Sequence, residues 1–433
     1  MIRGLTYEIV LWLFALAAIP KMLYQRIVHG KYRNCFSKRM GFAFPNIAKE
    51  DRELIWVHAV SVGETKAVAA LAKKLKESHK NSLLLVSSTT DTGHAEAMRS
   101  MPFADYHVYL PLDLYVLMNS IIRRVKPSIV VLSESDYWYN FMRLSKAHGA
   151  SIFVVNGKIS ERSTKRFQMV PGFCKELFSF VDFFSIQNQI YADRFASLSV
   201  PKEKMVITGN MKFDESYPKL TQEELISWRD QLGIKQTDKV LVVGSTHSPE
   251  EKLVLEALIE VWKEIPNLKA LIVPRHPERF SEVAGILSKQ SVPFIRFSQL
   301  NDRTGQESII LTDAMGQLRK CYQLADVALV GGSYTDRVGG HNIIEPCWYG
   351  VPVLFGPHMY TQPELVALVK EYKAGLQVNP ENLVATLLSL LNDQEKRLSL
   401  GRGGIKLMSD MQGATSKTFQ AIENQLKNKV SVG

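Results

Sequence analysis

From residue 54 onward, short apolar runs alternate with amphipathic stretches that are long enough to form helices. The apolar runs are continuous, which is typical of parallel strands that are buried on both faces of a sheet. A first series of predicted strands comprises residues 54–60, 82–88, 106–110, 128–132, 151–155 and 180–186. A second series comprises residues 240–243, 270–273, 294–297, 309–311, 327–330 and 351–354. This alternation predicts an α/β protein with two parallel sheets.

A polar segment at about 213–238 separates the two series. We therefore predict two doubly wound, Rossmann-like domains facing a cleft, at 41–215 and 216–395. A charged helical stretch occupies 396–433, and we expect it to pack back on the N-terminal domain. Because parallel sheets of this kind bind ligands at the carboxyl ends of their strands, the chemistry is expected in the loops that follow the strands.

One strongly apolar run precedes both series, at residues 9–19, and basic residues follow it. The run is shorter than the roughly 20 residues that a spanning helix needs, and it lacks the flanks and cleavage site of a signal peptide. We predict that residues 1–40 form an interfacial membrane anchor with a basic collar from Lys21 to Arg39. A core helix with a solvated basic loop, or a single span over about 5–23, remain as alternatives.

Composition and charge agree with this organisation. The chain has 433 residues, of which 46% are hydrophobic and 22% charged, values that exclude a disordered, collagenous or polytopic membrane protein. Residues 1–40 carry seven basic and one acidic residue, so they hold +6 of the net charge of +10. This places much of the charge at an anionic membrane surface, and no nucleic acid is expected as a partner. Four widely spaced cysteines without a CxxC pair favour a reducing cytoplasm.

Charged side chains follow several predicted strands of the first domain. Glu64, in a segment that opens a helix, is either a helix-start carboxylate or a general base. Glu134 ends the fourth strand and is placed to face the cleft; beside it lie Asp136 and three aromatic residues, but no cluster with metal-ligand spacing. Lys158 and Arg162 follow the fifth strand and are either phosphate ligands or part of a solvated loop.

The second domain carries polar residues after most of its predicted strands. They lie in the segments GST at 244–246, PRHP at 274–277, GGS at 331–333 and GGHNIIEP at 339–346. Arg275 can bind a phosphate bidentately, and the double glycine is expected to enter a short helix whose N–H groups cradle a phosphate. Glu345, one turn into that helix, can accept from ribose hydroxyls. These features predict a nucleotide site, although neither a dinucleotide nor a P-loop fingerprint is present.

In combination and in this order, six segments resemble the 3-deoxy-D-manno-octulosonic acid (Kdo) transferases of lipid A assembly. They are HAVSVGE at 58–64, SESDYWYN at 133–140, NGKISERS at 156–163, GNMKFD at 209–214, PRHPER at 274–279 and GGHNIIEP at 339–346. The resemblance implies a GT-B fold and an inverting glycosyltransferase, without metal or other cofactor, at the cytoplasmic face of the inner membrane. It implies transfer of Kdo from CMP-Kdo to a lipid A precursor (lipid IVA) and, in some members, to further Kdo residues.

Carried over by motif, the resemblance implies that Glu64 is the general base and that Glu134 and Lys212 stabilise the transition state. The implied CMP site comprises Pro274, Arg275, Met315, Gly316, Gln317, Asn342, Ile343, Ile344 and Glu345. Further acceptor or donor contacts are expected from Ser61, Gly63, Lys158, Ser160, Arg162, Ser245 and Thr246. The chain departs from the family pattern mainly on the acceptor side, with ESDYWYN at 134–140 where ETE-x-W-P-N is usual. Two alternatives remain, namely another GT-B nucleotide-sugar transferase of the cell envelope and a non-enzymatic protein that binds anionic lipid.

Overall fold

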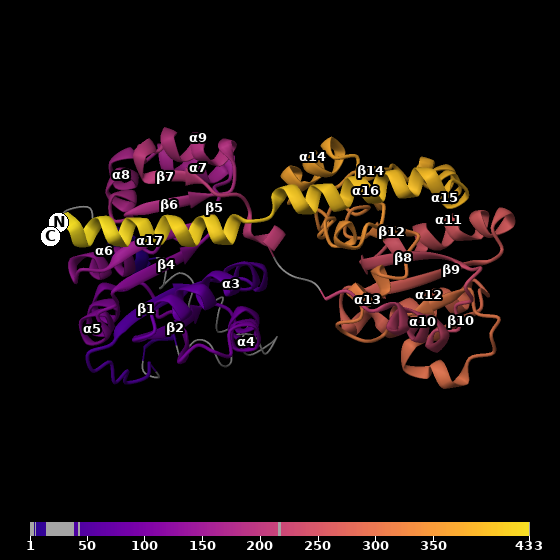
Figure 1. The fold of residues 1–433 in the computed structure, drawn as a ribbon, viewed down its shortest axis with the longest axis horizontal. Coiled ribbons are helices and arrows are strands. Elements are labelled where there is room, and N and C mark those ends of the chain that lie inside the picture. Colours follow the sequence, from indigo (N-terminus) through magenta and orange to yellow (C-terminus); the bar gives the residue numbers. More distant parts are fainter. Residues whose placement is uncertain (1–3, 5, 14–38, 42–43, 215–217, 433) are drawn as a thin grey trace. The chain divides into compact units, whose positions relative to one another are not determined.

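The computed structural model describes residues 4, 6–13, 39–41, 44–214 and 218–432 (Figure 1). The chain divides into two compact units, which are described separately below. The first unit comprises residues 1–215 together with 411–433, and the second comprises residues 216–410.

The first unit is built on a seven-stranded parallel sheet with the order β3-β2-β1-β4-β5-β6-β7. Its strands are β1 (Glu53–His58), β2 (Ser82–Ser88), β3 (Tyr106–Tyr109), β4 (Ile129–Ser133), β5 (Ser151–Gly157), β6 (Phe183–Ile186) and β7 (Met205–Ile207). The six predicted strands are confirmed. They could be recognised because strands that are buried on both faces are continuously apolar. The sequence reading missed β7, a three-residue strand at the edge of the sheet that is partly exposed.

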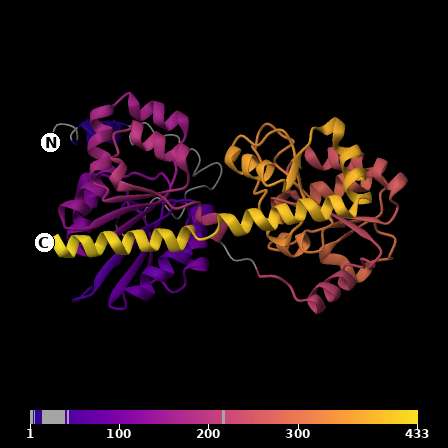
Figure 2. The same cartoon turned by 45° about the horizontal axis from the view of Figure 1, so that its top comes forward.

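Helices cover both faces of this sheet. Its helices are α3 (Val62–Ser78), α4 (Asp91–Ser100), α5 (Tyr115–Val125), α6 (Tyr139–Ala147), α7 (Glu161–Gln168), α8 (Pro171–Ser179), α9 (Gln189–Ser197), η1 (Lys202–Lys204), η2 (Met211–Asp214) and α17 (Ala414–Val432). One apolar core joins the sheet to α5, α6, α8 and α9, and a second joins its other face to α3, α4 and α17. In both views α17 lies along the first unit (Figures 1 and 2).

The second unit has its own seven-stranded parallel sheet, with the order β10-β11-β9-β8-β12-β13-β14. Its strands are β8 (Lys239–Thr246), β9 (Leu268–Pro274), β10 (Phe294–Arg296), β11 (Ile309–Leu311), β12 (Val327–Val330), β13 (Val353–Phe355) and β14 (Gly375–Gln377). Its helices are α10 (Gln222–Gln231), α11 (Glu250–Glu264), η3 (Pro277–Arg279), α12 (Phe280–Lys289), η4 (Phe297–Asp302), α13 (Leu318–Tyr322), η5 (Pro346–Tyr349), α14 (Pro363–Glu371), η6 (Pro380–Asn382), α15 (Leu383–Asn392) and α16 (Gln394–Met411). The strand β14, which was not predicted, lacks an apolar run.

The C-terminal stretch, expected as one helical unit at 396–433, consists of two helices that belong to different units. Helix α16 packs within the second unit, where a Cβ atom on Gly401 would lie 2.2 Å from the carbonyl oxygen of Gly350. The helical path is then interrupted at Gly413, which has φ of +97°, a conformation that glycine adopts readily. Only α17 packs on the first sheet, so the boundary lies near residue 411 instead of 396.

At the N-terminus, residues 6–13 form a helical segment. Tyr7 donates a hydrogen bond to Asp113 Oδ2 at 2.8 Å, and Glu8 Oε1 accepts from the N–H of Tyr115 at 3.1 Å. The apolar run continues into residues 14–19 and the collar into residues 21–38, which lie outside the described residues. Within the described part of the chain, no helix is both long and apolar enough to cross a bilayer.

Candidate active site

Three of the predicted site residues come together because β1, β4 and β5 are neighbours in the first sheet. Glu64 follows β1, Glu134 follows β4 and Lys158 follows β5. The carboxyl ends of neighbouring parallel strands share one edge of the sheet, which is the usual ligand-binding edge of this fold. The sequence-based placement of these side chains is therefore correct.

Glu64 is held at the start of α3 by reciprocal capping. The hydroxyl of Ser61, the N-cap residue, accepts from the N–H of Glu64 at 3.2 Å and donates to Glu64 Oε1 at 2.9 Å. Glu64 Oε2 accepts from the N–H of Val60 at 2.9 Å. Burial raises the pKa of Glu64 above its ordinary value; the hydrogen bond from Val60 opposes this shift, and the charge of Glu134 adds to it. A carboxylate with a raised pKa is a better proton acceptor than an ordinary surface glutamate.

Glu134 is a buried carboxylate between two ammonium groups. Its side chain is 4% exposed; Oε2 lies 2.5 Å from Lys158 Nζ, and Oε1 lies 3.7 Å from Lys212 Nζ. Burial opposes protonation of Lys158, but the charge of Glu134 outweighs it and raises the lysine pKa. Glu134 also has φ of +59°, a backbone conformation that non-glycine residues adopt mostly where the surroundings enforce it. Glu134, Lys158 and Lys212 are called the electrostatic centre of the site from here on.

Asn156 was given no role in the prediction from sequence, but it supports the electrostatic centre through two hydrogen bonds. Its Nδ2 donates to Glu134 Oε1 at 3.3 Å, and its Oδ1 accepts from the N–H of Met211 at 3.0 Å. Asn156 is fully buried and has φ of +53°. It thus joins the loop after β4 to the short helix η2 that carries Lys212. The local signal was an asparagine at the end of a buried strand, where its left-handed conformation is tolerated.

Asp136 is a second residue that the sequence reading left unassigned. Burial, reinforced by the charges of Glu64 and Glu134, raises its pKa to about 7. Its Oδ2 atom is buried and has no hydrogen-bond partner among the described residues. Asp136 therefore titrates close to neutral pH beside the other two carboxylates.

The remaining predicted contacts of the first unit divide into two groups. Gly63 lies close to the centre, since a Cβ atom there would be 4.0 Å from Lys212 Cε. Ser160 instead caps α7 by accepting from the N–H of Ser163 at 3.1 Å, and it is exposed. Arg162 is also exposed, and among the described residues it makes no contact with Glu134.

In the second unit, the loops after β8 and β12 are fastened by an internal carboxylate. Glu250, which is 1% exposed, accepts main-chain hydrogen bonds at 2.7–3.0 Å from His247, Gly332, Ser333 and Tyr334. The main-chain N–H groups of Gly332 and Ser333, in the GGS segment at 331–333, are thus occupied by this side chain. A hydrogen-bonded buried carboxylate of this kind is a structural support.

The two arginines of PRHPER have different environments. Arg279 makes a bidentate ion pair with the fully buried Glu251, with Nη1–Oε1 and Nη2–Oε2 distances of 2.5 and 3.1 Å. Arg275 is exposed, and its guanidinium contacts no carboxylate of the described chain. Its main-chain N–H donates to the carbonyl of Thr246 at 3.1 Å, which joins the ends of β9 and β8. Of the two arginines, only Arg275 is available to a ligand.

The expectation of a short helix opening near Asn342 is wrong. The 3-10 helix η5 begins only at Pro346 and has four residues. Asn342 Oδ1 accepts from the N–H of Ile344 at 3.2 Å, a side-chain bond that closes a local turn. The phosphate cradle at a helix N-terminus is therefore not formed, and Glu345 precedes the helix, with its Oε1 3.6 Å from Arg319 Nη2. The side chains of Ile343 and Ile344 are buried, so only their main chain can face a ligand.

The structure gives a steric reason for two consecutive glycines before Asn342. Gly339 and Gly340 have φ of +87° and +88°, and a Cβ atom on Gly340 would lie 2.1 Å from Met359 Sδ. His341 follows, with its Nε2 2.7 Å from Nε2 of His247. Burial, reinforced by the His247 charge, lowers the pKa of His341 to about 4. His341 is therefore neutral at physiological pH, and one of the two rings donates a hydrogen bond to the other.

The other predicted binding residues of this unit lie in a loop or at the ends of strands. Met315 is 57% exposed and Gly316 has φ of +81° in the turn between β11 and α13, which begins just after Gln317. Pro274 ends β9. Ser245, with φ of +57°, and the buried Thr246 form the bulged end of β8.

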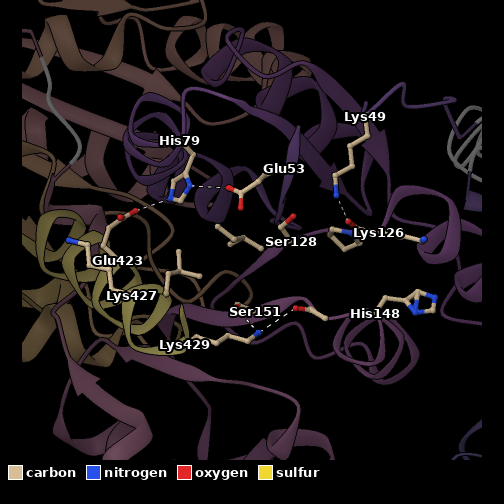
Figure 3. Close-up of a pocket in the computed structure, with 14 residues that line it drawn as sticks. Lys49, Glu53, His79, Lys126, Ser128, His148, Ser151, Glu423, Lys427 and Lys429 are labelled. Atoms are coloured by element: carbon tan, nitrogen blue, oxygen red, sulfur yellow. Dashed lines mark hydrogen bonds and ion pairs between the residues drawn. The ribbon is translucent and has the colours of Figure 1, made fainter. Parts of the chain in front are cut away.

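A cavity of about 900 Å³ opens at the opposite edge of the first sheet, beside the starts of β1, β4 and β5 (Figure 3). His79 bridges Glu53 and Glu423 there, at 3.3 and 3.0 Å, and Lys429 donates to Ser151 Oγ at 3.0 Å. None of the side chains of the electrostatic centre lines this cavity. Although this cavity is large, we do not assign the active site to it.

Two Rossmann-like units with parallel sheets, each carrying polar loops after its strands, have the architecture of the GT-B fold. Among solved structures, the chain is similar to the UDP-GlcNAc 2-epimerase of Neisseria meningitidis bound to UDP-GlcNAc (TM-score 0.58, 13% identity, 87% of this chain and 100% of that one). It is equally similar to a glycosyltransferase from Rickettsia africae (TM-score 0.58, 15% identity, 87% and 100%). At these identities the likeness shows the fold.

The family follows from sequence comparison. Residues 34–215 match the model described as 3-deoxy-D-manno-octulosonic-acid transferase (kdotransferase), and residues 224–407 match glycosyl transferases group 1. The chain is 34% identical over 422 residues to the 3-deoxy-D-manno-octulosonic acid transferase of Chlamydophila psittaci, covering 97% of this chain and 96% of the relative. It is 31% identical over 404 residues to the transferase of that name from Haemophilus influenzae, covering 92% and 93%. The chain belongs to the Kdo transferase family and is a glycosyltransferase, as the motifs predicted.

Proposed function

We propose that the protein transfers at least one Kdo residue from CMP-Kdo to a lipid A precursor such as lipid IVA, with inversion and without a metal ion. The observation that carries this proposal is the electrostatic centre at the strand ends of the first unit. Glu64 has a raised pKa beside a buried carboxylate, Glu134, that is paired with Lys158 and Lys212. A base next to fixed charges of both signs suits a reaction in which a hydroxyl attacks a sugar that carries a phosphate leaving group.

In this mechanism Glu64 takes the proton from the acceptor hydroxyl. At the same time, the oxygen of that hydroxyl forms a bond to the anomeric carbon of Kdo. The bond from that carbon to the CMP phosphate breaks, and its electron pair leaves with the phosphate. Positive charge develops on the sugar in the oxocarbenium-like transition state, and Glu134 offsets it. Lys212 offsets the negative charge that develops on the leaving group. Attack opposite to the leaving phosphate inverts the anomeric configuration.

The second unit would bind CMP. Arg275 supplies the cationic group for the phosphate because its guanidinium makes no ion pair within the described chain. The turn at 315–317 and the main chain at 342–344 supply the remaining contacts from neighbouring loops, with Pro274 and Glu345 beside them.

The function is tested by incubating the full chain with CMP-Kdo and lipid IVA in the presence of EDTA. We expect release of CMP and a glycolipid whose mass has increased by one or more Kdo residues, at the same rate with and without the chelator. A rate restored only by added Mg²⁺ would contradict the metal-independent mechanism. Turnover of a UDP-sugar in place of CMP-Kdo would support another envelope transferase, and vesicle binding without any turnover would support a lipid-binding protein.

We also propose that the helical segment 6–13 anchors the protein at the cytoplasmic face of the inner membrane. Four apolar side chains of this segment are between 51% and 62% exposed: Ile9, Val10, Trp12 and Leu13. Tyr7 and Glu8 hold the segment on the first unit, so these apolar side chains have a fixed backbone support. Their exposure and the basic residues that follow in sequence are what an interfacial anchor on anionic lipid requires.

Trp12→Glu is expected to weaken binding to vesicles of phosphatidylcholine and phosphatidylglycerol about tenfold or more, since burial of a large apolar side chain contributes about 1.5–3 kcal/mol. Cosedimentation measures this change. The control is Met169→Glu, which removes an apolar side chain that is 81% exposed between α7 and α8 and should not alter binding. Equal binding by all three proteins would contradict the anchor.

A further inference from the structure

Asp214 connects the GNMKFD segment to the far end of the chain. It is the last residue of η2 and lies two positions after Lys212. Its Oδ1 accepts from the N–H of Gly413 at 2.6 Å, and its Oδ2 accepts from the N–H of Thr415 at 2.5 Å. These N–H groups lie at the start of α17, where a helix has unsatisfied donors and favours a negative charge. Asp214 therefore caps a helix that lies 199 positions further along the chain.

The other side of η2 is fixed independently. The N–H of Met211 donates to Asn156 at 3.0 Å, and the N–H of Lys212 donates to Asn210 at 3.0 Å. The side chains of Met211 and Phe213 are buried in the first unit. The lysine side chain itself is 36% exposed, and Glu134 is its ion-pair partner in the site, with Nζ 3.7 Å from Oε1. The position of the Lys212 ammonium group thus depends on how firmly its backbone is held.

The same contact lies where the chain passes between its two units. The first passage follows residue 215, and the return passage is at residues 410 and 411. Asp214 and Gly413 thus belong to the two passages and are hydrogen-bonded to each other within the first unit. At the same place a Cβ atom on Gly209, which has φ of +96°, would lie only 3.4 Å from the Cβ atom of Ala414. The start of α17 is therefore closely packed on the segment that carries Lys212.

We propose that Asp214 is a positioning residue that holds Lys212 beside Glu134 by capping α17. The reactive site then depends on the docking of the C-terminal helix. Loss of the cap leaves two donors of α17 without their acceptor and frees one end of η2. This inference rests on the role of Lys212 in the proposed transferase reaction.

The test compares Asp214→Ala and Asp214→Asn with the parent chain in the CMP-Kdo and lipid IVA assay. We expect kcat per folded molecule to fall about 10- to 100-fold in the alanine variant, because displacement of a catalytic group by about 1 Å can cost 10²-fold. The asparagine variant should lose less, since its single amide oxygen can still accept one of the two N–H groups. KM for CMP-Kdo should stay within about twofold, because residues 216–410 form a separate unit. Amide hydrogen exchange at the start of α17 should become faster in both variants.

Asp410→Asn is the matched control. Asp410 lies three residues before Gly413, is exposed and pairs only with Lys406 among the ion pairs of the described chain, at 2.6 Å. Its replacement should change neither kcat nor exchange in α17. A fall in kcat equal to that of the Asp214 variants would overturn the inference, because it would show a general sensitivity of this segment.

Lys212→Gln separates the inference from the function on which it rests. If this variant turns over normally, the proposed role of Lys212 is wrong, whatever the Asp214 variants do. If it loses activity while Asp214→Ala keeps its full kcat, the proposed function stands and the positioning role is overturned. A purely structural role would reduce the amount of folded protein and leave kcat per folded molecule unchanged. If the alanine variant does not fold, the kcat of Asp214→Asn decides between these outcomes.

Discussion

Glu64→Gln is expected to reduce kcat for Kdo transfer about 10²- to 10⁴-fold, the range that a general base contributes. The amide oxygen of glutamine can still accept the N–H of Val60, so the capped start of α3 should persist. It cannot take a proton from the acceptor hydroxyl. Steady-state kinetics measure the loss, and thermal unfolding checks that the fold is kept. Glu77→Gln is the control, since Glu77 lies on the same helix but pairs with Lys73 on the surface.

The pH dependence gives a second readout of the same residue. Because the base acts only when ionised and the pKa of Glu64 is raised by burial, kcat should fall with decreasing pH while still above the ordinary glutamate value of about 4.3. In Glu64→Gln, this acidic limb should vanish from the residual rate. Asp136 has a pKa of about 7, so Asp136→Asn is needed to show that the limb does not belong to that neighbour. Normal turnover by Glu64→Gln, or an unchanged acidic limb, would end the assignment of the base.

Arg279→Met is expected to lower the free energy of unfolding of the second unit by about 3–5 kcal/mol. The change would leave the fully buried carboxylate of Glu251 without its bidentate partner, and an uncompensated buried charge carries a cost of that size. Urea denaturation of the full chain, followed by hydrogen exchange in α11, measures the loss in the unit concerned.

Arg275→Met is the matched control from the same motif. Since its guanidinium is exposed and makes no ion pair in the described chain, stability should stay within about 0.5 kcal/mol of the parent. Calorimetry should instead show CMP binding weakened about tenfold or more, because a charge-assisted bond to phosphate is lost. Reversed results for the two arginines would refute the division between a structural and a ligand-binding arginine.

Much of the fold could be predicted because each buried strand of a parallel sheet is a continuous apolar run that can be recognised in the local sequence. Strands such as Ser82–Ser88 and Ile309–Leu311 lie where the apolar runs lie, since both of their faces are covered. The missed strands β7 and β14 lie at sheet edges and are only partly buried, whereas the equally short β11 and β13 are fully buried apolar runs and were predicted. The short helix expected near Asn342 begins only at Pro346, and the Asn342 side chain closes a local turn by accepting from the N–H of Ile344.

The sequence by itself determined the class of protein, and it determined that Glu64, Glu134 and Lys158 lie at one edge of a sheet. This was possible because neighbouring parallel strands bring their carboxyl ends together whatever the detail of packing. Only the tertiary structure decided which arginine of PRHPER is structural and that Asp214 caps α17. These partners are distant in sequence, and nothing local distinguishes a paired side chain from a free one. Their roles are set by which helices and loops pack against each other, and that choice depends on the whole fold.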